Sequence, residues 1–317
     1  MRGRSGFQTG SEPQGRSGAH GYNKTVMHRF ILHNEEIREA DETCLSPGQV
    51  GLLSGWGVFT TIRVARGVLF AWERHWARLQ RDAALLRVPF PQQPDAIHDR
   101  LVALVRANQV REAAMRVAII RNCGGPWEGP GLKRPWDLIA LTSDLTDWGE
   151  GVRLAIAPHA RHAGGRFAGT KVLSWAFNLA LLEEAQTRGF DEVILLNEHG
   201  QVSECTSANI FVIQGNAAWT PPLRSGCLPG ITREILLTEI RLPGIEVGER
   251  DLFVHDLERA DEVLITSTTR NLLPVLEIES LVLRRNSTTG ARLRQAFVQY
   301  MDHYVAEREI TAGTRQP

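Results

Sequence analysis

The sequence predicts a mixed α and β protein with two domains, a small α+β domain followed by a larger α/β domain. Its 317 residues exceed the common domain size of about 100 to 150 residues, and a hydrophobic content of 43% allows a sizeable core. Short strand patterns bounded by turn signals alternate with segments of helical spacing. We expect residues 27–144 to form the small domain, residues 145–151 a linker and residues 152–317 the large domain.

Charge and composition limit the classes of partner. Lys plus Arg and Asp plus Glu both number 36, so the formal net charge is zero and gives no electrostatic footprint for nucleic acid or an anionic membrane. No apolar run reaches the roughly 18 residues of a membrane span. The cysteines show no spacing typical of a metal site or a disulfide framework. We expect a small-molecule partner, no metal and a cytoplasmic location, with residues 1–26 as a disordered extension.

In the first half of the chain, apolar periodicity predicts a hairpin and then helices and strands. A three-residue turn ending at Gly67 separates the two strands of the hairpin. Pro89 ends the first helix. The expected elements are strands over 57–64, 68–72, 115–121 and 136–142, and helices over 73–88 and 95–108.

Two arginines of this half are candidate ligand contacts. Arg78 lies one turn after Arg74 on the helix that follows the hairpin, where its guanidinium could bind a phosphate through two hydrogen bonds. A solvated arginine on an amphipathic helix is the commoner interpretation. Arg116 lies inside the apolar strand, and a charge there must be paired or face a cleft. A substrate carboxylate and an ion-paired or edge-strand arginine are equal alternatives for Arg116.

In the second half, strand and helix patterns alternate from residue 152 onward. The segment 161–166 has the Gly-rich composition of a mobile loop. The expected elements are strands over 152–157, 191–197, 201–204, 210–213, 217–220 and 261–269, and helices over 176–188, 231–240 and 291–306.

Three features of this half bear on chemistry. Lys171 approaches a helix N-terminus, whose positive dipole end would lower the pKa of the amine and favour a nucleophile. Glu204 ends an alternating strand, so its carboxylate could point inward and face an aromatic nitrogen. Ile231 and Thr232 open a helix, where free N–H groups and a hydroxyl form an anion site. The hydroxyls of the strand end at 266–269 would add further phosphate donors.

Each of these features has an ordinary structural explanation when taken alone. A lone lysine is usually a surface charge, a glutamate usually faces solvent, and a threonine at a helix start is usually a cap. Together, an amine, an inward carboxylate and an anion site are the groups needed to hold an aldehyde cofactor that carries an aromatic nitrogen and a phosphate. They predict a site for pyridoxal 5'-phosphate.

The chain resembles the class IV (fold type IV) pyridoxal-phosphate aminotransferases, which include branched-chain and D-amino acid aminotransferases and the related aminodeoxychorismate lyases. The resemblance covers roughly residues 28–300. It implies a small N-terminal domain, a larger pseudo-barrel domain, a site in the cleft between them and a homodimer whose second subunit helps to wall that cleft. The motifs that carry it are Glu204-Cys-Thr-Ser-Ala-Asn-Ile-Phe211, Leu228-Pro-Gly-Ile-Thr-Arg233, Ala260-Asp-Glu-Val263 and His75-Trp-Ala-Arg-Leu79.

The resemblance also implies roles for single residues. Lys171 is similar to the Schiff-base lysine, and Glu204 to the partner of the pyridine nitrogen. Apart from the resemblance, we expect Arg116 or the backbone near Thr269 to hold the substrate carboxylate, because a charge inside an apolar strand must be paired or face a cleft. The remaining implied cofactor contacts are the phosphate cradle of Arg78, Ile231, Thr232, Ser267 and Thr268, with Leu228 packed on the ring and Ser207 in the loop beside it.

Departures from the family pattern concern the substrate. Ala176 stands where many branched-chain members carry a tyrosine five residues after the lysine, and Phe59-Thr-Thr-Ile-Arg63 stands where they tend to show Phe-Glu-Gly-Ile-Arg. Thr61 is similar to the lyases, whereas Pro126 and Trp127 break the lyase-like Gly-Gly-Arg-Gly loop.

We therefore expect a transaminase that moves an amino group between an amino acid, with a branched-chain donor favoured, and a 2-keto acid. The alternative is an aminodeoxychorismate lyase that eliminates pyruvate to form 4-aminobenzoate, with Thr61 assisting proton delivery. A third hypothesis is a binding or scaffolding protein without activity. The presence of Lys171, Glu204 and Thr232 argues against it, because such a protein is free to lose them.

Overall fold

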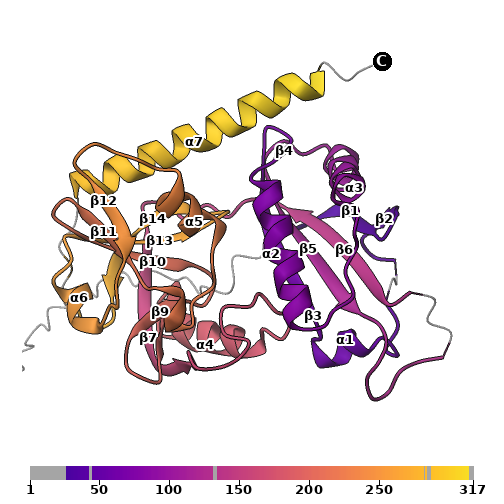
Figure 1. The fold of residues 1–317 in the computed structure, drawn as a ribbon, viewed down its shortest axis with the longest axis horizontal. Coiled ribbons are helices and arrows are strands. Elements are labelled where there is room, and N and C mark those ends of the chain that lie inside the picture. Colours follow the sequence, from indigo (N-terminus) through magenta and orange to yellow (C-terminus); the bar gives the residue numbers. More distant parts are fainter. Residues whose placement is uncertain (1–25, 43–44, 131–133, 282, 284–286, 314–317) are drawn as a thin grey trace, which may run out of the picture.

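Two lobes joined by a long C-terminal helix make up the computed structural model, which describes residues 26–42, 45–130, 134–281, 283 and 287–313. Figure 1 shows the lobe of the first half on the right, the lobe of the second half on the left and helix α7 running along the top of both. Almost all of the expected disordered extension, residues 1–25, lies outside the described residues.

The first lobe is built on a six-stranded antiparallel sheet in the order β2-β1-β6-β5-β3-β4. Strand β5 alternates buried and partly buried residues because successive side chains of a strand point to opposite faces. The elements are β1 (Met27–His33), β2 (Glu36–Glu39), α1 (Val50–Ser54), β3 (Gly57–Ala65), β4 (Val68–Leu69), α2 (Trp72–Leu85), α3 (Pro94–Ala107), β5 (Ala113–Arg121) and β6 (Trp136–Ser143).

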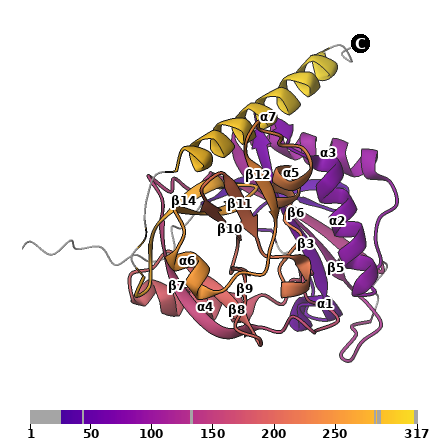
Figure 2. The ribbon, with the colours of Figure 1, turned by 60° about the vertical axis from the view of Figure 1, so that its left-hand side comes forward.

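The second lobe is built on an eight-stranded mixed sheet in the order β12-β11-β10-β13-β14-β7-β8-β9. Figure 2, turned from the view of Figure 1, shows these strands curling around the lobe. The elements are β7 (Val152–Arg161), α4 (Ala176–Thr187), β8 (Glu192–Asn197), β9 (Val202–Cys205), β10 (Asn209–Gln214), β11 (Ala217–Thr220), a 3-10 turn (Leu223–Ser225), α5 (Ile231–Thr238), β12 (Glu246–Glu249), α6 (Val254–Glu258), β13 (Glu262–Ser267), β14 (Asn271–Ile278) and α7 (Thr288–Gly313).

The elements predicted from periodicity are present, with ends that differ by up to four residues, except that α7 extends seven residues beyond the predicted 291–306 at its C-terminal end. Strand β14 was not predicted, since Pro274 lies inside it and proline is disfavoured in a central strand. In the structure Pro274 pairs with Leu264 of β13, while β7 lies on the other side of β14. Short elements such as α1, β12 and α6 carry too few residues for a periodic signal.

A shared apolar core joins the lobes. Phe70, which follows β4, packs edge-on against Phe297, Tyr300 and Tyr304 of α7. The Tyr304 hydroxyl donates a hydrogen bond of 2.7 Å to the carboxylate of Glu73 at the start of α2. Helix α7 therefore fixes α2 relative to the second sheet.

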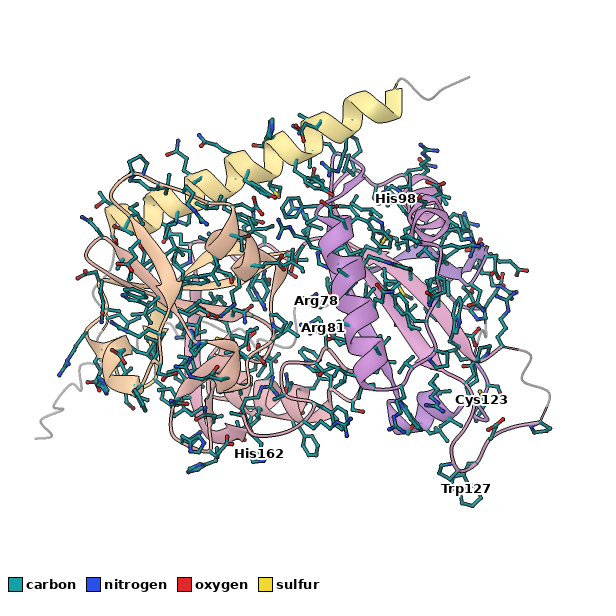
Figure 3. All side chains as sticks on the ribbon, in the orientation of Figure 1. Arg78, Arg81, His98, Cys123, Trp127 and His162 are labelled. Atoms are coloured by element: carbon teal, nitrogen blue, oxygen red, sulfur yellow. The ribbon has the colours of Figure 1, made fainter. Side chains whose placement is uncertain are left out.

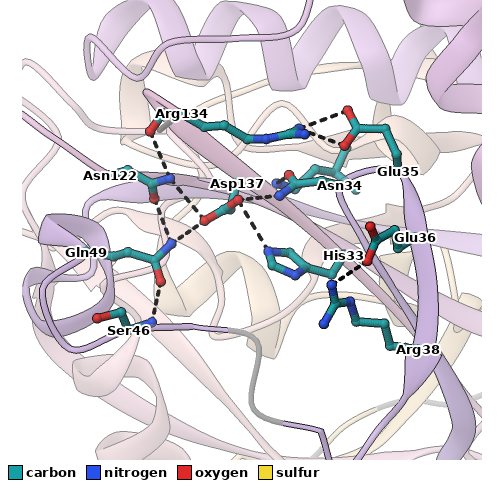
Figure 4. A network of polar contacts seen from close by, with 11 residues as sticks. His33, Asn34, Glu35, Glu36, Arg38, Ser46, Gln49, Asn122, Arg134 and Asp137 are labelled. Carbon is teal, nitrogen blue, oxygen red and sulfur yellow. Dashed lines mark hydrogen bonds and ion pairs between the residues drawn. The ribbon is translucent and has the colours of Figure 1, made fainter. Parts of the chain in front are cut away.

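A buried polar network holds the far end of the first sheet, as Figure 4 shows. Asp137 accepts hydrogen bonds from the side-chain amides of Asn34, Gln49 and Asn122. The ring of His33 lies 3.3 Å from the same carboxylate. A buried carboxylate needs several partners to offset the loss of hydration, so this network is structural, and none of its members lines the cavity of the candidate site.

Among the described residues, no helix combines the length and the apolar character that crossing a membrane requires.

Candidate active site

One cavity of about 460 Å³ receives side chains from both lobes. Strands β3 and β5 and helix α2 line it from the first lobe, and Figure 3 places Arg78 and Arg81 on the side of α2 that faces the second lobe. Every site residue predicted from the sequence lines this cavity: Thr61, Arg78, Arg116, Lys171, Glu204, Ser207, Leu228, Ile231, Thr232, Ser267, Thr268 and Thr269.

The Lys171 segment crosses to the first lobe before α4 begins. The Phe59 N–H donates to the Lys171 carbonyl (3.1 Å), and the Leu173 N–H donates to the Gly57 carbonyl (3.0 Å). A Cβ on Gly57 would lie 2.5 Å from the backbone carbonyl oxygen of Ile119 on β5, as well as 2.4 Å from Leu173 Cδ1, so a side chain at this position would force the backbone apart. The segment is thereby added to the edge of β3, and Lys171 Nζ lies 4.5 Å from the centroid of the Phe59 ring.

The Lys171 amine is enclosed by the cavity walls, and this burial lowers the pKa of Lys171 to about 7. The guanidinium groups of Arg78 and Arg116 lower this pKa further, while the carboxylates of Glu204 and Asp82 oppose them. The expected cause was the dipole of α4. In the structure the largest cause is burial, since the amine faces the cavity and Lys171 lies five residues before the first residue of α4. A large fraction of the amine is neutral near pH 7.

Glu204 lies at the end of β9 with 6% of the residue exposed, so the solvent-facing interpretation is wrong. Arg161 donates to one carboxylate oxygen (3.0 Å), and the Leu228 N–H donates to the other (3.0 Å). Burial raises the pKa of Glu204, and the charge of Arg161 opposes that rise. Each oxygen keeps a second lone pair that can face a donor in the cavity.

The spacing of the Glu204 to Asn209 motif has a physical explanation. Glu204 accepts the N–H of Leu228, and the side-chain amide of Asn209 donates to the Leu228 carbonyl (2.8 Å). The two ends of the motif therefore bind the N–H and the carbonyl of the same residue, Leu228. A Cβ on Gly230 would lie 2.0 Å from the Asn209 side-chain oxygen, which explains the glycine before α5.

Arg78 is 8% exposed, so it is not the solvated arginine of the alternative interpretation. Its guanidinium donates to the Thr60 hydroxyl (2.9 Å) and to the Pro229 carbonyl (3.3 Å). The Thr60 oxygen also lies 2.7 Å from Nδ1 of the buried His75. Burial lowers the pKa of Arg78 to about 10, which leaves it a cation at neutral pH.

The start of α5 has the properties of an anion site. Gly230 precedes the helix without a side-chain cap, and the Thr232 residue is 2% exposed. In the part of the chain that the structure describes, the buried hydroxyls of Thr232 and Thr266 have no hydrogen-bond partner. Buried polar atoms without partners are rare in native proteins. These orphaned hydroxyls, with the cation of Arg78, fit a phosphate group.

Arg116 lies opposite Thr61 across the β3–β5 pair. Its guanidinium carbon lies 3.9 Å from the centroid of the Phe59 ring, the same ring that lies under Lys171. Burial lowers the pKa of Arg116. Within the described ranges the guanidinium has neither a hydrogen-bond nor an ion-pair partner, in contrast to the ion-paired alternative. It is available to a carboxylate in the cavity.

A polar network around Arg270 also lines the cavity. The Ser207 hydroxyl donates to Glu192 and accepts from Arg270 (2.8 Å). The Arg270 guanidinium also stacks on Trp148, 4.1 Å from the ring centroid. The backbone N–H of Arg270 donates to the Ser267 hydroxyl (3.2 Å). The hydroxyls of Ser207 and Ser267 are thus partly committed to protein contacts, although both residues line the cavity.

Sequence reasoning missed Phe59, Asp82 and Arg161. Phe59 could have been found because it lies two residues before Thr61 on the same face of a strand. Arg161 belongs to the segment expected to be mobile, but it is the last residue of β7 and pairs with Glu204. Asp82 gave no local signal, since its partner is the backbone of a residue 89 positions away.

The comparisons with known proteins all indicate the same family. A family model described as amino-transferase class IV matches residues 57–278. A Methanocaldococcus jannaschii protein, provisionally named a branched-chain-amino-acid aminotransferase, is 33% identical over 86% of this chain and 96% of its own. The D-alanine aminotransferase of Bacillus licheniformis is 28% identical over 78% of this chain and 88% of its own.

The crystal structure of Escherichia coli branched-chain amino acid aminotransferase superimposes with a TM-score of 0.79, at 25% identity over 86% of this chain and 95% of that one. The expected mixed α and β architecture of fold type IV, with its two curled sheets, is confirmed by this similarity.

Proposed function

Because the chain belongs to the class IV aminotransferases, a family of enzymes that use pyridoxal phosphate, we propose that it is a transaminase acting between an amino acid and a 2-keto acid. The observation that carries this proposal is the enclosed Lys171 amine with a pKa of about 7. It lies in one cavity with the orphaned Thr232 hydroxyl and the unpaired Arg116 guanidinium.

The residues present fit pyridoxal 5'-phosphate. Lys171 would hold it covalently through Nζ, and Glu204 would face the pyridine nitrogen with the lone pairs that Arg161 and the Leu228 N–H leave free. Leu228 would pack on the ring. The phosphate would lie at the start of α5, with further donors from Arg78, Ile231, Thr232, Ser267 and Thr268.

The cofactor supplies an electron sink for the bonds at the donor's Cα, and the protein supplies orientation and proton transfer. Lys171 Nζ, with its pKa of about 7, can take a proton from Cα and return it near neutral pH. Arg116 would bind the donor's carboxylate, with the backbone near Thr269 as a second contact. The Phe59 ring lies against both the Arg116 guanidinium and the Lys171 amine and covers one side of each group.

A panel of substrates tests this proposal. The purified protein with its cofactor should transfer amino groups from amino acids, with branched-chain donors preferred, and turnover should require a keto acid such as 2-oxoglutarate or pyruvate. The panel should include both enantiomers, because the relatives include both branched-chain and D-alanine aminotransferases. Absence of transfer from every donor would contradict the proposal.

The lyase alternative has its own observation, since Thr61 lines the cavity and lies opposite Arg116. A lyase would release pyruvate from aminodeoxychorismate with no keto acid present. The same panel therefore includes aminodeoxychorismate without an acceptor, and pyruvate release there in place of amino transfer would favour the lyase.

Arg116→Leu tests the substrate class. The carboxylate would lose a charge-assisted partner in a buried site, so kcat/KM for amino acids should fall by about 10²-fold, mainly through KM. Amines without a carboxylate should be little affected. Arg121→Leu is the matched control, because Arg121 also lies on β5 and stacks on an aromatic ring, Trp56, but outside the cavity. An equal loss for both amine classes would contradict the assigned role.

A further inference from the structure

Helix α2 presents two buried charged side chains, Arg78 and Asp82, on one face. They are four residues apart, which places them one turn from each other on a helix. Asp82 is 1% exposed, so its carboxylate has left water for specific partners. Arg78 donates a hydrogen bond to the Pro229 carbonyl, just before α5, and Asp82 accepts a hydrogen bond from the Lys171 N–H.

Asp82 and its neighbour Arg81 both bind the main chain between Gly169 and Lys171. The Lys171 N–H donates to Asp82 Oδ2 (3.1 Å). Arg81 Nε donates to Asp82 Oδ1 (2.8 Å), and the Arg81 guanidinium also donates to the Gly169 carbonyl (3.1 Å). Gly169 itself has a positive φ of 70°, and a Cβ there would lie 2.7 Å from the Cys227 carbonyl oxygen. The main chain before the amine is therefore fixed by one carboxylate, one guanidinium and one tight turn.

We propose that Asp82 is the positioning residue of Lys171: its carboxylate fastens the Lys171 backbone to α2 and holds the amine in the cavity at a set distance from the Arg78 end of the same helix. This inference rests on the proposed function only in taking Lys171 as the cofactor lysine. The hydrogen bond fixes the point of the main chain from which the Lys171 side chain extends into the cavity.

Asp82 also contributes charge. The charged groups that face the Lys171 amine are Arg78 and Asp82 from α2, Arg116 from β5 and Glu204 from β9. The two arginines lower the pKa of Lys171, and the two carboxylates raise it. Removing the Asp82 charge should therefore lower this pKa further and extend the neutral amine to lower pH.

Two variants separate the hydrogen bond from the charge. Asp82→Asn keeps an oxygen that can accept the Lys171 N–H but is neutral, and Asp82→Ala loses both properties. Asp99→Asn, an exposed carboxylate on α3, is the matched control. The full-length protein freed of cofactor is used for two measurements: amide hydrogen exchange at Lys171, and acetylation of its amine by acetic anhydride across pH. The chain has only two other lysines, Lys24 and Lys133, which serve as internal references.

In Asp82→Ala the Lys171 amide should exchange faster by about tenfold, because one buried hydrogen bond is lost. In Asp82→Asn exchange should stay close to wild type. In both variants the midpoint of Lys171 acetylation should move to lower pH, while the Asp99→Asn midpoint stays in place. A merely structural role would not move the Asp82→Asn midpoint.

Unchanged exchange in Asp82→Ala would overturn the proposal, and an unchanged acetylation midpoint in Asp82→Asn would overturn the contribution of the Asp82 charge. If Asp82→Ala fails to fold, exchange in Asp82→Ser decides the proposal, because serine lacks the Oδ2 atom that accepts the Lys171 N–H. Neither measurement depends on turnover, so failure of the transaminase assignment would leave both results interpretable.

Discussion

Lys171→Ala should abolish amino transfer and covalent retention of pyridoxal phosphate together. The variant loses both the amine that would hold the cofactor and the group that moves the proton at the donor's Cα, so the expected loss of kcat exceeds about 10³-fold. Borohydride reduction followed by peptide mass spectrometry should find the pyridoxyl group on the peptide containing Lys171 in the wild type and nowhere in the variant.

The control for this prediction uses the small number of lysines. Lys24→Ala and Lys133→Ala should keep the reducible attachment and the activity, because neither belongs to the predicted site. An active Lys171→Ala protein, or a pyridoxyl group on Lys24 or Lys133, would remove the assignment.

Covalent attachment of the cofactor to Lys171 should become slower as the pH falls. Only the neutral amine attacks the cofactor's aldehyde, and the pKa of Lys171 is about 7. The rate of covalent uptake by cofactor-free protein should therefore be nearly constant above pH 8 and fall as pH drops through 7, approaching a tenfold loss per unit. An exposed lysine would keep losing rate throughout the range below pH 10.

Glu204→Gln should lower kcat by about 10²-fold or more while leaving the cofactor attached. The glutamine keeps one oxygen, which can accept from Arg161 or from the Leu228 N–H but not from both in their present positions, and it carries no negative charge to keep a pyridine nitrogen protonated. The variant should retain the borohydride-reducible cofactor on Lys171, which separates this effect from that of Lys171→Ala.

The chain offers a closely matched control in Glu262. Its carboxylate, like that of Glu204, is nearly buried, pairs with one partly exposed arginine, Arg294, and accepts one backbone N–H, that of Ser287. Glu204→Gln and Glu262→Gln should each lower the free energy of unfolding by about 1–2 kcal/mol, because each leaves an arginine with a weaker partner. Only Glu204→Gln should lose activity. Equal losses of activity would indicate that the effect is one of stability.

Local sequence patterns were sufficient for most of the secondary structure. The helices α2, α3, α4 and α5 and the strands β3, β5 and β8 follow from periodicity that each segment carries in itself. The patterns failed at β14, where Pro274 occupies a central strand, and at Arg161, where a Gly-rich neighbourhood conceals the end of a strand. In both places contacts with strands distant in sequence override the local preference.

The sequence also indicated which residues could carry the chemistry, because each motif combines several residue types that predict a site when they occur together. Glu204 with Asn209, and Gly230 with Thr232, mark the two walls on which a ring and a phosphate could lie. Their residues line the one cavity that Lys171 also lines. The roles of the individual residues stay predictions, which the variants above test.

The amino-acid sequence by itself indicated the family, most of the longer helices and strands, and the residue types of the site, since these depend on neighbours within a few positions. The tertiary structure decided which charges surround the Lys171 amine and how they are held: Asp82 lies 89 positions away and the Arg161–Glu204 pair spans 43. The pKa of a buried group depends on its loss of hydration and on charges within a few ångströms, whatever element carries them. The Asp82 contact forms only when α2 packs against the Lys171 segment, and the Arg161–Glu204 contact forms only when the second sheet brings the ends of β7 and β9 together.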